Sequence, residues 1–253
     1  MPDDALISLH EVDKRFATGT LALESVSLQV QAGEFVSLLG PSGCGKSTVL
    51  RLVAGLDQAS RGAVRVAPSD PTAQPAAFVF QDPTLMPWAS VFDNVWLPLR
   101  LAGVPRRQAH PRIEPLLQRL GLADFADARP AELSGGMKMR VSIARALVTR
   151  PRVLLMDEPF AALDEITRQR LNADLLDRWA DQSPAVMFVT HSVVEAVFLS
   201  QRVLVMGARP GRVVAEVRIE EAYPRSAAFR TSMDFALACR RLSQALEGQE
   251  STP

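Results

Sequence analysis

A glycine-rich run early in the chain has the make-up of a phosphate-binding loop. Residues 40–48 follow the pattern G-x-x-x-x-G-K-[ST]. The members of this loop are Gly40, Pro41, Ser42, Gly43, Cys44, Gly45, Lys46, Ser47 and Thr48. Glycines let successive backbone N–H groups point at an anion, and the amino end of a following helix adds a positive dipole. In such loops the lysine reaches the β- and γ-phosphates of a nucleotide, and the serine next to it ligates Mg²⁺. The loop therefore predicts binding of a nucleoside triphosphate, without distinguishing an ATPase from a kinase or a GTPase.

A pair of acidic residues follows a run of apolar residues in the second half of the chain. Residues 153–156 read Val-Leu-Leu-Met, and Asp157 and Glu158 come directly after them. A buried strand that ends in an aspartate places a carboxylate at the carboxyl edge of a parallel sheet, where open α/β sheets bind ligands. We expect Asp157 to bind Mg²⁺ through water. Glu158 could polarise the water that attacks the phosphate. The alternative is that both acids begin a solvated loop.

Two further polar residues follow apolar runs in the same manner. Gln81 comes after residues 76–80, and His191 comes after residues 186–190. The amide oxygen of Gln81 could ligate Mg²⁺ and position the attacking water. His191 could hydrogen-bond the γ-phosphate and help to hold the water and Glu158. Taken alone, each residue would be read as a structural or solvated side chain, so both assignments depend on the phosphate-binding loop and the acidic pair.

Strands and helices must bring these residues together, and the apolar pattern predicts both. Short apolar runs predict strands near residues 6–9, 23–30, 34–39, 62–66, 76–80, 153–156, 186–189, 202–206 and 213–217. The run at 62–66 is expected to form a short hairpin. Helical spacing predicts helices after residue 48, within 113–120, 141–147 and 168–179, after His191, and from Tyr223 onward with 247–253 frayed. Residues 67–75, rich in Pro, Ser, Thr and Asp, are expected to form a loop.

The composition limits the class of protein. The 253 residues carry 28 basic and 28 acidic side chains, so the electrostatic footprint of a nucleic-acid-binding protein is not expected. The two cysteines, Cys44 and Cys239, are far apart and lack CxxC spacing, which argues against a disulfide framework. The amino terminus lacks an export signal, and no run approaches the roughly 18–20 apolar residues of a membrane span. We expect any membrane-spanning part of the system to be another chain.

A third motif identifies the family that the chain resembles. Leu133, Ser134, Gly135, Gly136 and Met137 precede a helical pattern and form a second helix N-terminus able to bind an anion. With the phosphate-binding loop upstream and the acidic pair downstream, this motif closely resembles the signature of ABC-type ATPases. The match covers nearly the whole chain. The remaining residues that the resemblance assigns are Phe16 as the aromatic that stacks on adenine, Gln81 in the Q-loop, Leu163 and Asp164 in the D-loop (Phe-Ala-Ala-Leu-Asp, 160–164) and His191 as the switch histidine.

The resemblance implies a fold and a mode of action. The expected fold is an α/β P-loop NTPase of the ABC ATPase type, with a mostly parallel core sheet, an N-terminal antiparallel β lobe and an inserted helical lobe at about 88–150. The ATPase domain would span 1–222 and a helical tail 223–253. Two copies of the chain would pack head to tail, so that the signature of one caps the γ-phosphate held by the other. ATP binding would close the dimer and hydrolysis would reopen it. The catalytic residues would be Glu158, His191, Gln81 and Lys46.

The resemblance also implies partners. They are membrane-spanning permease subunits and, indirectly, an extracytoplasmic solute-binding protein, with the chain peripheral on the cytoplasmic face of the inner membrane and no nucleic acid bound. Residues 81–88, 160–164 with 167–168, and 209–213 resemble the nitrate/sulfonate/taurine importer ATPases. That group includes importers of pyrimidine precursors of thiamine. Residues 138–140 read Lys-Met-Arg where the group usually has Arg-Gln-Arg, so the solute stays open.

Several alternatives remain at this point. Trp88 could be an exposed anchor for a partner or an ordinary core aromatic. Cys44 could be a redox switch or simply a side chain small enough for the loop. The tail from Tyr223 could be a regulatory helix or packing. A non-transport ABC ATPase that acts on DNA or ribosomes would usually carry coiled coils, two ATPase domains or basic patches, and the sequence has none of these. A module that holds ATP without hydrolysing it is disfavoured by Glu158 and His191.

Overall fold

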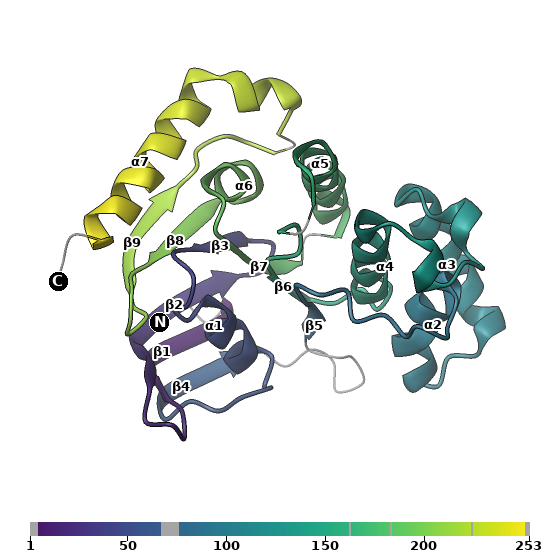
Figure 1. The fold of residues 1–253 in the computed structure, drawn as a ribbon, viewed down its shortest axis with the longest axis horizontal. Coiled ribbons are helices and arrows are strands. Elements are labelled where there is room, and N and C mark those ends of the chain that lie inside the picture. The colour runs from purple at the N-terminus through teal and green to yellow at the C-terminus, as the bar shows by residue number, and fades with distance from the viewer. Residues whose placement is uncertain (1–4, 67–75, 162, 183, 224, 251–253) are drawn as a thin grey trace.

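Two β-sheets form the centre of the molecule in a computed structural model that describes residues 5–66, 76–161, 163–182, 184–223 and 225–250 (Figure 1). The expected loop at 67–75, Ala162 of the D-loop motif and residues 251–253 lie outside the described residues. A mostly parallel core sheet and an antiparallel N-terminal sheet are both present, so the fold class expected from the sequence is confirmed.

The N-terminal sheet is antiparallel and has the strand order β2-β1-β4. Its strands are β1 (Ala5–Arg15), β2 (Leu21–Gln31) and β4 (Arg61–Val66). The hairpin expected at 62–66 is wrong, because β4 pairs with the distant β1, for example Val64 with Leu9. Gly62 permits this pairing: it has a φ of 84°, and a Cβ there would lie 2.4 Å from the carbonyl oxygen of Glu11. The backbones approach too closely for a side chain at this position.

The core sheet has the strand order β5-β6-β7-β3-β8-β9. Its strands are β3 (Phe35–Leu39), β5 (Ala76–Val79), β6 (Val153–Asp157), β7 (Ala185–Thr190), β8 (Arg202–Met206) and β9 (Val213–Arg218). All pairs are parallel except β8 with β9. Every residue of β3 and β7 is buried, as expected for parallel strands that are covered on both faces. The apolar runs in the sequence reflect this burial.

The register of the core sheet brings the chemistry-bearing residues to one edge. Leu39 of β3 lies opposite Thr190 of β7, and Asp157 of β6 lies opposite Val189. The loop after β3, the acids at the end of β6 and the residue after β7 therefore emerge side by side. This is the carboxyl edge of the sheet, where α/β folds bind ligands.

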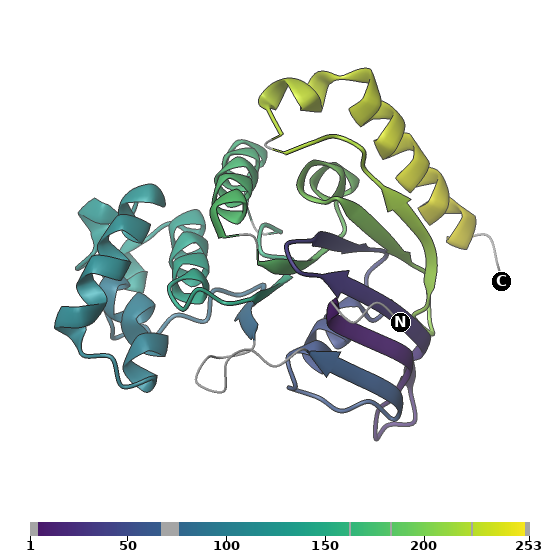
Figure 2. The same cartoon turned by 180° about the vertical axis from the view of Figure 1, so that it is seen from behind.

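Helices cover both faces of the core sheet. On one face, α1 (Lys46–Val53) shares an apolar cluster with the N-terminal sheet and with residues of β3, β6 and β7. On the other face lie α5 (Glu165–Gln182), α6 (Val193–Leu199) and α7 (Met233–Glu250). Figure 2 shows the same layers from behind. Helix α7 packs on α6, β8 and β9, with Leu242 fully buried, and runs to Glu250 rather than fraying from residue 247.

Three helices form a lobe at the far side of β5 and β6 (Figure 1). They are α2 (Val91–Leu101), α3 (Arg106–Arg119) and α4 (Gly135–Leu147). Their facing sides build an apolar cluster of their own, with Val95, Ile113 and Val141 each fully buried. Short 3-10 turns at Ala123–Phe125 and Pro130–Glu132 connect α3 to α4. The exact domain boundaries expected from the sequence stay a prediction. Among the described helices, none has the length and apolar character needed to cross a bilayer.

Candidate active site

The loop between β3 and α1 is held in a conformation that requires glycine. Gly45 caps α1 with a φ of 96°, and a Cβ there would lie 2.5 Å from the side chain of Leu23. A Cβ on Gly40 would lie 2.6 Å from the carbonyl oxygen of Met206. Because these neighbours are packed in the core, neither position can accept a larger residue without a shift of the backbone. The amino end of α1 therefore stays open to an anion.

Lys46 is a buried ammonium group whose hydrogen-bond partners within the described residues are all neutral. Its side chain is 4% exposed, and Nζ donates to the carbonyl oxygens of Gly40 at 2.8 Å and Pro41 at 2.9 Å. Its nearest acidic oxygen is Glu158 Oε1 at 4.0 Å. A buried charge is costly unless an opposite charge approaches it closely. A phosphate in the loop would meet this need.

Ser47 and Asp157 bring a hydroxyl group and a carboxylate together across the sheet edge. The Ser47 hydroxyl donates to Asp157 Oδ1 at 2.9 Å. Burial raises the pKa of Asp157, against the opposing effect of this hydrogen bond. Oxygen ligands of this kind suit Mg²⁺, and a cation would offset the cost of burying the carboxylate. The two side chains therefore fit the metal that the sequence predicts.

Glu158 and His191 face each other at the same edge. His191 Nδ1 lies 3.0 Å from Glu158 Oε2. The backbone of Glu158 has a φ of 43°, unusual for a residue with a side chain, and its N–H donates to the carbonyl oxygen of Val189 at 3.0 Å. That bond anchors the turn after β6 to β7. His191 directly follows Thr190, the last residue of β7. A carboxylate held by an imidazole can accept a proton from water.

Lys46, Ser47 and Glu158 line one cleft of about 490 Å³, whereas Asp157 and His191 contact it only through Ser47 and Glu158. The residues that line it are Phe16, Thr20, Leu21, Ala22, Ser42, Gly43, Gly45, Lys46, Ser47, Thr48, Gln81, Glu158 and Arg209. The cleft thus joins Phe16 and Gln81, which the sequence placed in the site, to the phosphate-binding loop and to Glu158. Phe16 is 40% exposed, and Lys14 Nζ lies over its ring at 5.2 Å from the ring centre.

Arg209 is a residue of the cleft that the sequence reasoning did not place there. A Cβ on Gly43 would lie 2.8 Å from Arg209 Nη2, so the guanidinium rests against the phosphate-binding loop. The turn that carries Arg209 is fastened to β2, because Gly211 N–H donates to the carbonyl oxygen of Ala22 at 2.9 Å. The sequence feature that could have indicated a role for Arg209 is the Arg-Pro-Gly turn, which belongs to one of the stretches that resemble the importer ATPases.

The signature residues lie outside the lining of the cleft. Ser134 caps α4, with its Oγ accepting from the N–H of Met137 at 3.3 Å, and Leu133 is buried. Among the residues that the structure describes, a Cβ on Gly135 would have no neighbour within 4 Å, so the amino end of this helix is open. Gly136 instead faces the start of α5, where Thr167 Cγ2 would lie 3.1 Å from a Cβ. The chain therefore presents two separate helix ends to anions.

The D-loop residues lie between these two regions. Asp164 Oδ1 accepts from the N–H of Thr167 at 3.0 Å, and this hydrogen bond lowers the pKa of Asp164. Leu163 is buried and would lie 3.7 Å from a Cβ on Gly136. The D-loop thus contacts the signature helix and leads into α5.

Cys44 is inaccessible within the phosphate-binding loop. Its side chain is 1% exposed, and burial raises the pKa of its thiol. Reactive cysteines have a lowered pKa and are reachable from solvent. The structure favours the simpler interpretation, in which a small side chain fits the loop.

Trp88 projects from a rigid turn and is 72% exposed, so it is not a core aromatic. The buried side chain of Asn94 holds the turn, because its Nδ2 donates to the carbonyl oxygens of Met86 and Ala89 at 3.2 Å each. Arg145 of α4 donates to the carbonyl oxygens of Pro83 and Thr84, both at 2.9 Å. The segment after Gln81 is therefore tied to the helical lobe.

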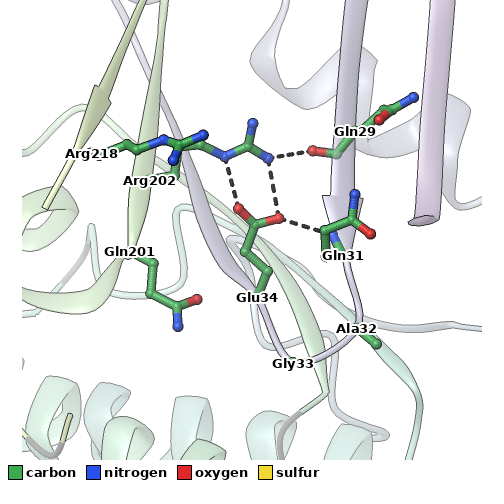
Figure 3. Close-up of a pocket in the computed structure, with 8 residues that line it drawn as sticks. All are labelled: Gln29, Gln31, Ala32, Gly33, Glu34, Gln201, Arg202 and Arg218. Atoms are coloured by element: carbon green, nitrogen blue, oxygen red, sulfur yellow. Dashed lines mark hydrogen bonds and ion pairs between the residues drawn. The ribbon is translucent and has the colours of Figure 1, made fainter. Parts of the chain in front are cut away.

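A second hollow lies at the opposite, amino end of β3 (Figure 3). Its charged groups satisfy one another: Arg202 Nε donates to Glu34 Oε1 at 2.8 Å, and Glu34 Oε2 accepts from the N–H of Gln31 at 2.9 Å. Gln201 Oε1 accepts from the N–H of Phe35. These bonds hold β2, β3 and β8 together, and we assign this hollow a structural role.

Comparison with known proteins agrees with this geometry. A family model described as ABC transporter matches residues 23–161. The chain is 47% identical over 214 residues to the aliphatic sulfonates import ATP-binding protein SsuB 1 of Pseudomonas savastanoi pv. phaseolicola, covering 85% of this chain and 86% of that protein. It is 48% identical over 209 residues to the taurine import ATP-binding protein TauB of Rhizobium johnstonii, covering 81% of this chain and 79% of that protein.

Solved structures of similar fold include cbiO1 and MJ0796. cbiO1 from Clostridium perfringens, part of the ABC transporter complex cbiONQ, has a TM-score of 0.77 at 27% identity and covers 97% of this chain and 100% of that one. The ATP-binding cassette MJ0796, dimeric and bound to ADP and Pi in a post-hydrolysis state, has a TM-score of 0.73 at 32% identity. That match covers 85% of this chain and 100% of the cassette.

Proposed function

This chain belongs to the ABC transporter family as an ATP-hydrolysing subunit, and from this premise we propose that it powers the import of a small anion of the sulfonate or taurine kind. Two relatives at 47% and 48% identity are named for the import of aliphatic sulfonates and of taurine. A pyrimidine solute, the alternative left open by the sequence, has no comparable support. The solute would contact other chains, namely a permease and a solute-binding protein.

The observation that carries the proposal is the position of Glu158 beside both the buried Lys46 and His191. Lys46 Nζ and His191 Nδ1 lie 4.0 Å and 3.0 Å from the two carboxylate oxygens of Glu158. In our account Lys46 and the loop amides bind the β- and γ-phosphates, and Glu158 takes a proton from the attacking water. His191 holds Glu158 and the water in place.

Mg²⁺ would be held by Ser47, by Asp157 through water and by Gln81, and when bound it would neutralise charge on the phosphates. Ser47 and Asp157 are already in contact at 2.9 Å, and Gln81 lines the same cleft. Phe16, at the rim of the cleft, would stack on the adenine ring. Each of these roles assigns a residue of this chain to Mg²⁺ or to ATP.

Closing the site is proposed to need a second copy of the chain. The open helix end at Gly135 lies outside the lining of the cleft that holds Lys46. In a head-to-tail dimer, Ser134–Gly136 of one copy would cap the γ-phosphate bound by the other. The dimeric state of the MJ0796 cassette, a relative at 32% identity, supports this arrangement.

Docking to permease subunits is proposed to use the turn around Trp88. A large exposed aromatic held by buried hydrogen bonds has the character of an interface anchor. The link from Arg145 to Pro83 and Thr84 would pass motion of the helical lobe to this turn. The chain would then lie on the cytoplasmic face of the inner membrane as a peripheral subunit.

The proposal is tested with purified chain and with cells. Lys46→Ala should abolish ATP binding, and Glu158→Gln should bind ATP but release little phosphate. Cells that carry either variant as their sole copy should lose uptake of radiolabelled taurine or ethanesulfonate. ATP hydrolysis without any effect on uptake of either sulfonate would leave the ATPase assignment standing and overturn the proposed solute.

A further inference from the structure

Beneath His191 lies a polar link that joins its segment to the D-loop within one chain. Arg168 of α5 donates through Nη2 to the carbonyl oxygen of Leu163 at 2.8 Å. Its Nε lies 3.6 Å from Oε1 of Glu195, a carboxylate of α6 that is only 5% exposed. The guanidinium thus has the D-loop backbone on one side and the helix after His191 on the other.

Glu195 continues the link to the residues on either side of His191. Thr190 Oγ1 donates to Glu195 Oε2 at 2.5 Å, and the N–H of Ser192 donates to Thr190 Oγ1 at 3.0 Å. The N–H of Glu195 in turn donates to Ser192 Oγ at 3.3 Å. The residues before and after His191 are therefore connected to the buried carboxylate of Glu195 through the hydroxyl group of Thr190.

The location of this carboxylate is not explained by stability alone. A buried ion pair contributes little to stability compared with apolar residues of similar volume, because both charges must leave water. The pair is also incomplete: Arg168 Nε has no hydrogen-bond partner within the described residues, and 3.6 Å exceeds a normal N–H···O bond. A displacement of a few tenths of an ångström in either segment would make this bond. The separation of Arg168 and Glu195 is therefore sensitive to the relative position of the two segments.

We propose that Arg168, Glu195 and Thr190 are positioning residues that hold His191 over Glu158 and make that position depend on the D-loop. The inference rests on the proposed function of Glu158 and His191. A small hollow lined by Arg168, Thr190, Glu195, His191 and Glu158 joins the link to the catalytic pair. Movement of Leu163 pulls on Arg168, and through Glu195 and Thr190 it changes where the imidazole lies.

The Thr190 hydroxyl can be tested with a matched pair of variants in the full-length chain. Thr190→Val has nearly the same shape but lacks the hydroxyl, whereas Thr190→Ser keeps it. We expect Thr190→Val to lower kcat for ATP by about tenfold or more, since small displacements of catalytic groups have effects of this size. Its KM should change little, and Thr190→Ser should stay near the wild-type rate. Equal rates for the two variants would overturn the proposal.

A double-mutant comparison separates positioning from simple support of the fold. Arg168→Met should lower kcat in the otherwise wild-type chain but have almost no effect in a chain that already carries His191→Ala. Arg170→Met, an exposed arginine on the same helix, is the matched control and should be silent in both. If Arg168→Met lowers kcat by the same factor in the wild-type chain and in the His191→Ala chain, the proposal is contradicted.

The melting temperature of Arg168→Met and the activity of Glu158→Gln show whether a loss of kcat comes from the link, from unfolding or from a wrong catalytic assignment. If Arg168→Met lowers the melting temperature, Glu195→Gln takes its place, because it removes the charge while preserving the shape. If Glu158→Gln remains as active as wild type, the proposed catalytic assignment fails, whereas the Thr190 pair tests the link on its own. Failure of the link and failure of the function therefore give different results.

Discussion

The hydroxyl of Ser47 donates a hydrogen bond to the carboxylate of Asp157 across 2.9 Å, between residues 110 positions apart in the chain. The bond joins the first turn of α1 to the end of β6. It also leaves a partly buried carboxylate at the site where a cation is proposed to bind. Desolvation at this position disfavours the charged form of Asp157.

Replacing Asp157 should stabilise the empty chain while removing its activity. Burial raises the pKa of Asp157, so the folded state binds this proton more tightly than the unfolded chain. The stability contributed by this group is then present at low pH and is lost as the pH rises through the interval between the two pKa values. Asp157→Asn keeps an acceptor for Ser47 without the charge. It should raise Tm at neutral pH by roughly 2–4 °C and abolish ATP hydrolysis.

Thermal melts across pH check this prediction. The difference in Tm between Asp157→Asn and wild type should shrink as the pH is lowered, because the wild-type carboxyl group becomes neutral. Asp127→Asn, at an exposed position, is the control and should leave Tm unchanged. A variant that melts below wild type at neutral pH would contradict the electrostatic account of this carboxylate.

Glu158→Gln should separate binding from hydrolysis. The amide preserves the shape of the side chain but cannot accept a proton from water, so kcat should fall by about 10²–10⁴-fold with ATP still bound. Single-turnover release of phosphate and ATP binding by filter retention measure the two steps. Glu114→Gln, on an exposed part of α3, is the control. Turnover at the wild-type rate would exclude Glu158 as the base.

Phe16→Ala should weaken ATP binding with little change in the rate of the chemical step. Stacking of a base on an aromatic ring contributes about 1–3 kcal/mol, so KM for ATP should rise roughly tenfold while kcat is retained. Phe125 is exposed to the same extent, 40%, but lies in the helical lobe. Phe125→Ala should therefore leave KM unchanged, and an equal rise in both variants would contradict the assignment.

Trp88→Ala should disconnect the ATPase from the membrane. Loss of a central aromatic anchor costs about 2 kcal/mol or more of binding free energy, so the amount of chain that sediments with permease-containing membranes should fall steeply. ATP hydrolysis by the isolated chain should be unaffected. Leu101→Ala removes a side chain of similar exposure, 74% against 72%, from the same lobe. If both variants still sediment like wild type, the turn around Trp88 is not the docking surface.

The sequence was informative where the chemistry is local and less so where distant segments meet. Gly45, Lys46 and Ser47 lie at one strand–helix junction, so their spacing alone predicts their arrangement. Arg209 reaches Gly43 only because the turn after β8 is fastened to β2, a pairing that no local pattern encodes. Gln81 and His191 also reach the site from distant strands. The sequence therefore assigns them to the site only when the phosphate-binding loop and the acidic pair are considered with them.

In the fold, too, local features could be predicted from the sequence and pairings between distant segments could not. The apolar runs of the parallel strands were evident because those strands are buried on both faces. The hairpin predicted at 62–66 was wrong for two reasons. The residues of β4 are mostly exposed and show little hydrophobic pattern, and the strand that β4 pairs with, β1, lies far away in the chain. Trp88 could not be assigned from periodicity, since its exposure depends on the turn that Asn94 holds.

The central claim is that each catalytic site combines the phosphate-binding loop of one copy with the signature of another, and mixing two inactive variants tests it most directly. Lys46→Ala damages the loop, and Ser134→Arg blocks the signature. In a mixed dimer, one site receives both lesions and the other receives neither. Activity should return to about a quarter of wild type, because about half of the randomly formed dimers are mixed and each has one intact site. A mixture that stays as inactive as its two components would contradict the composite site.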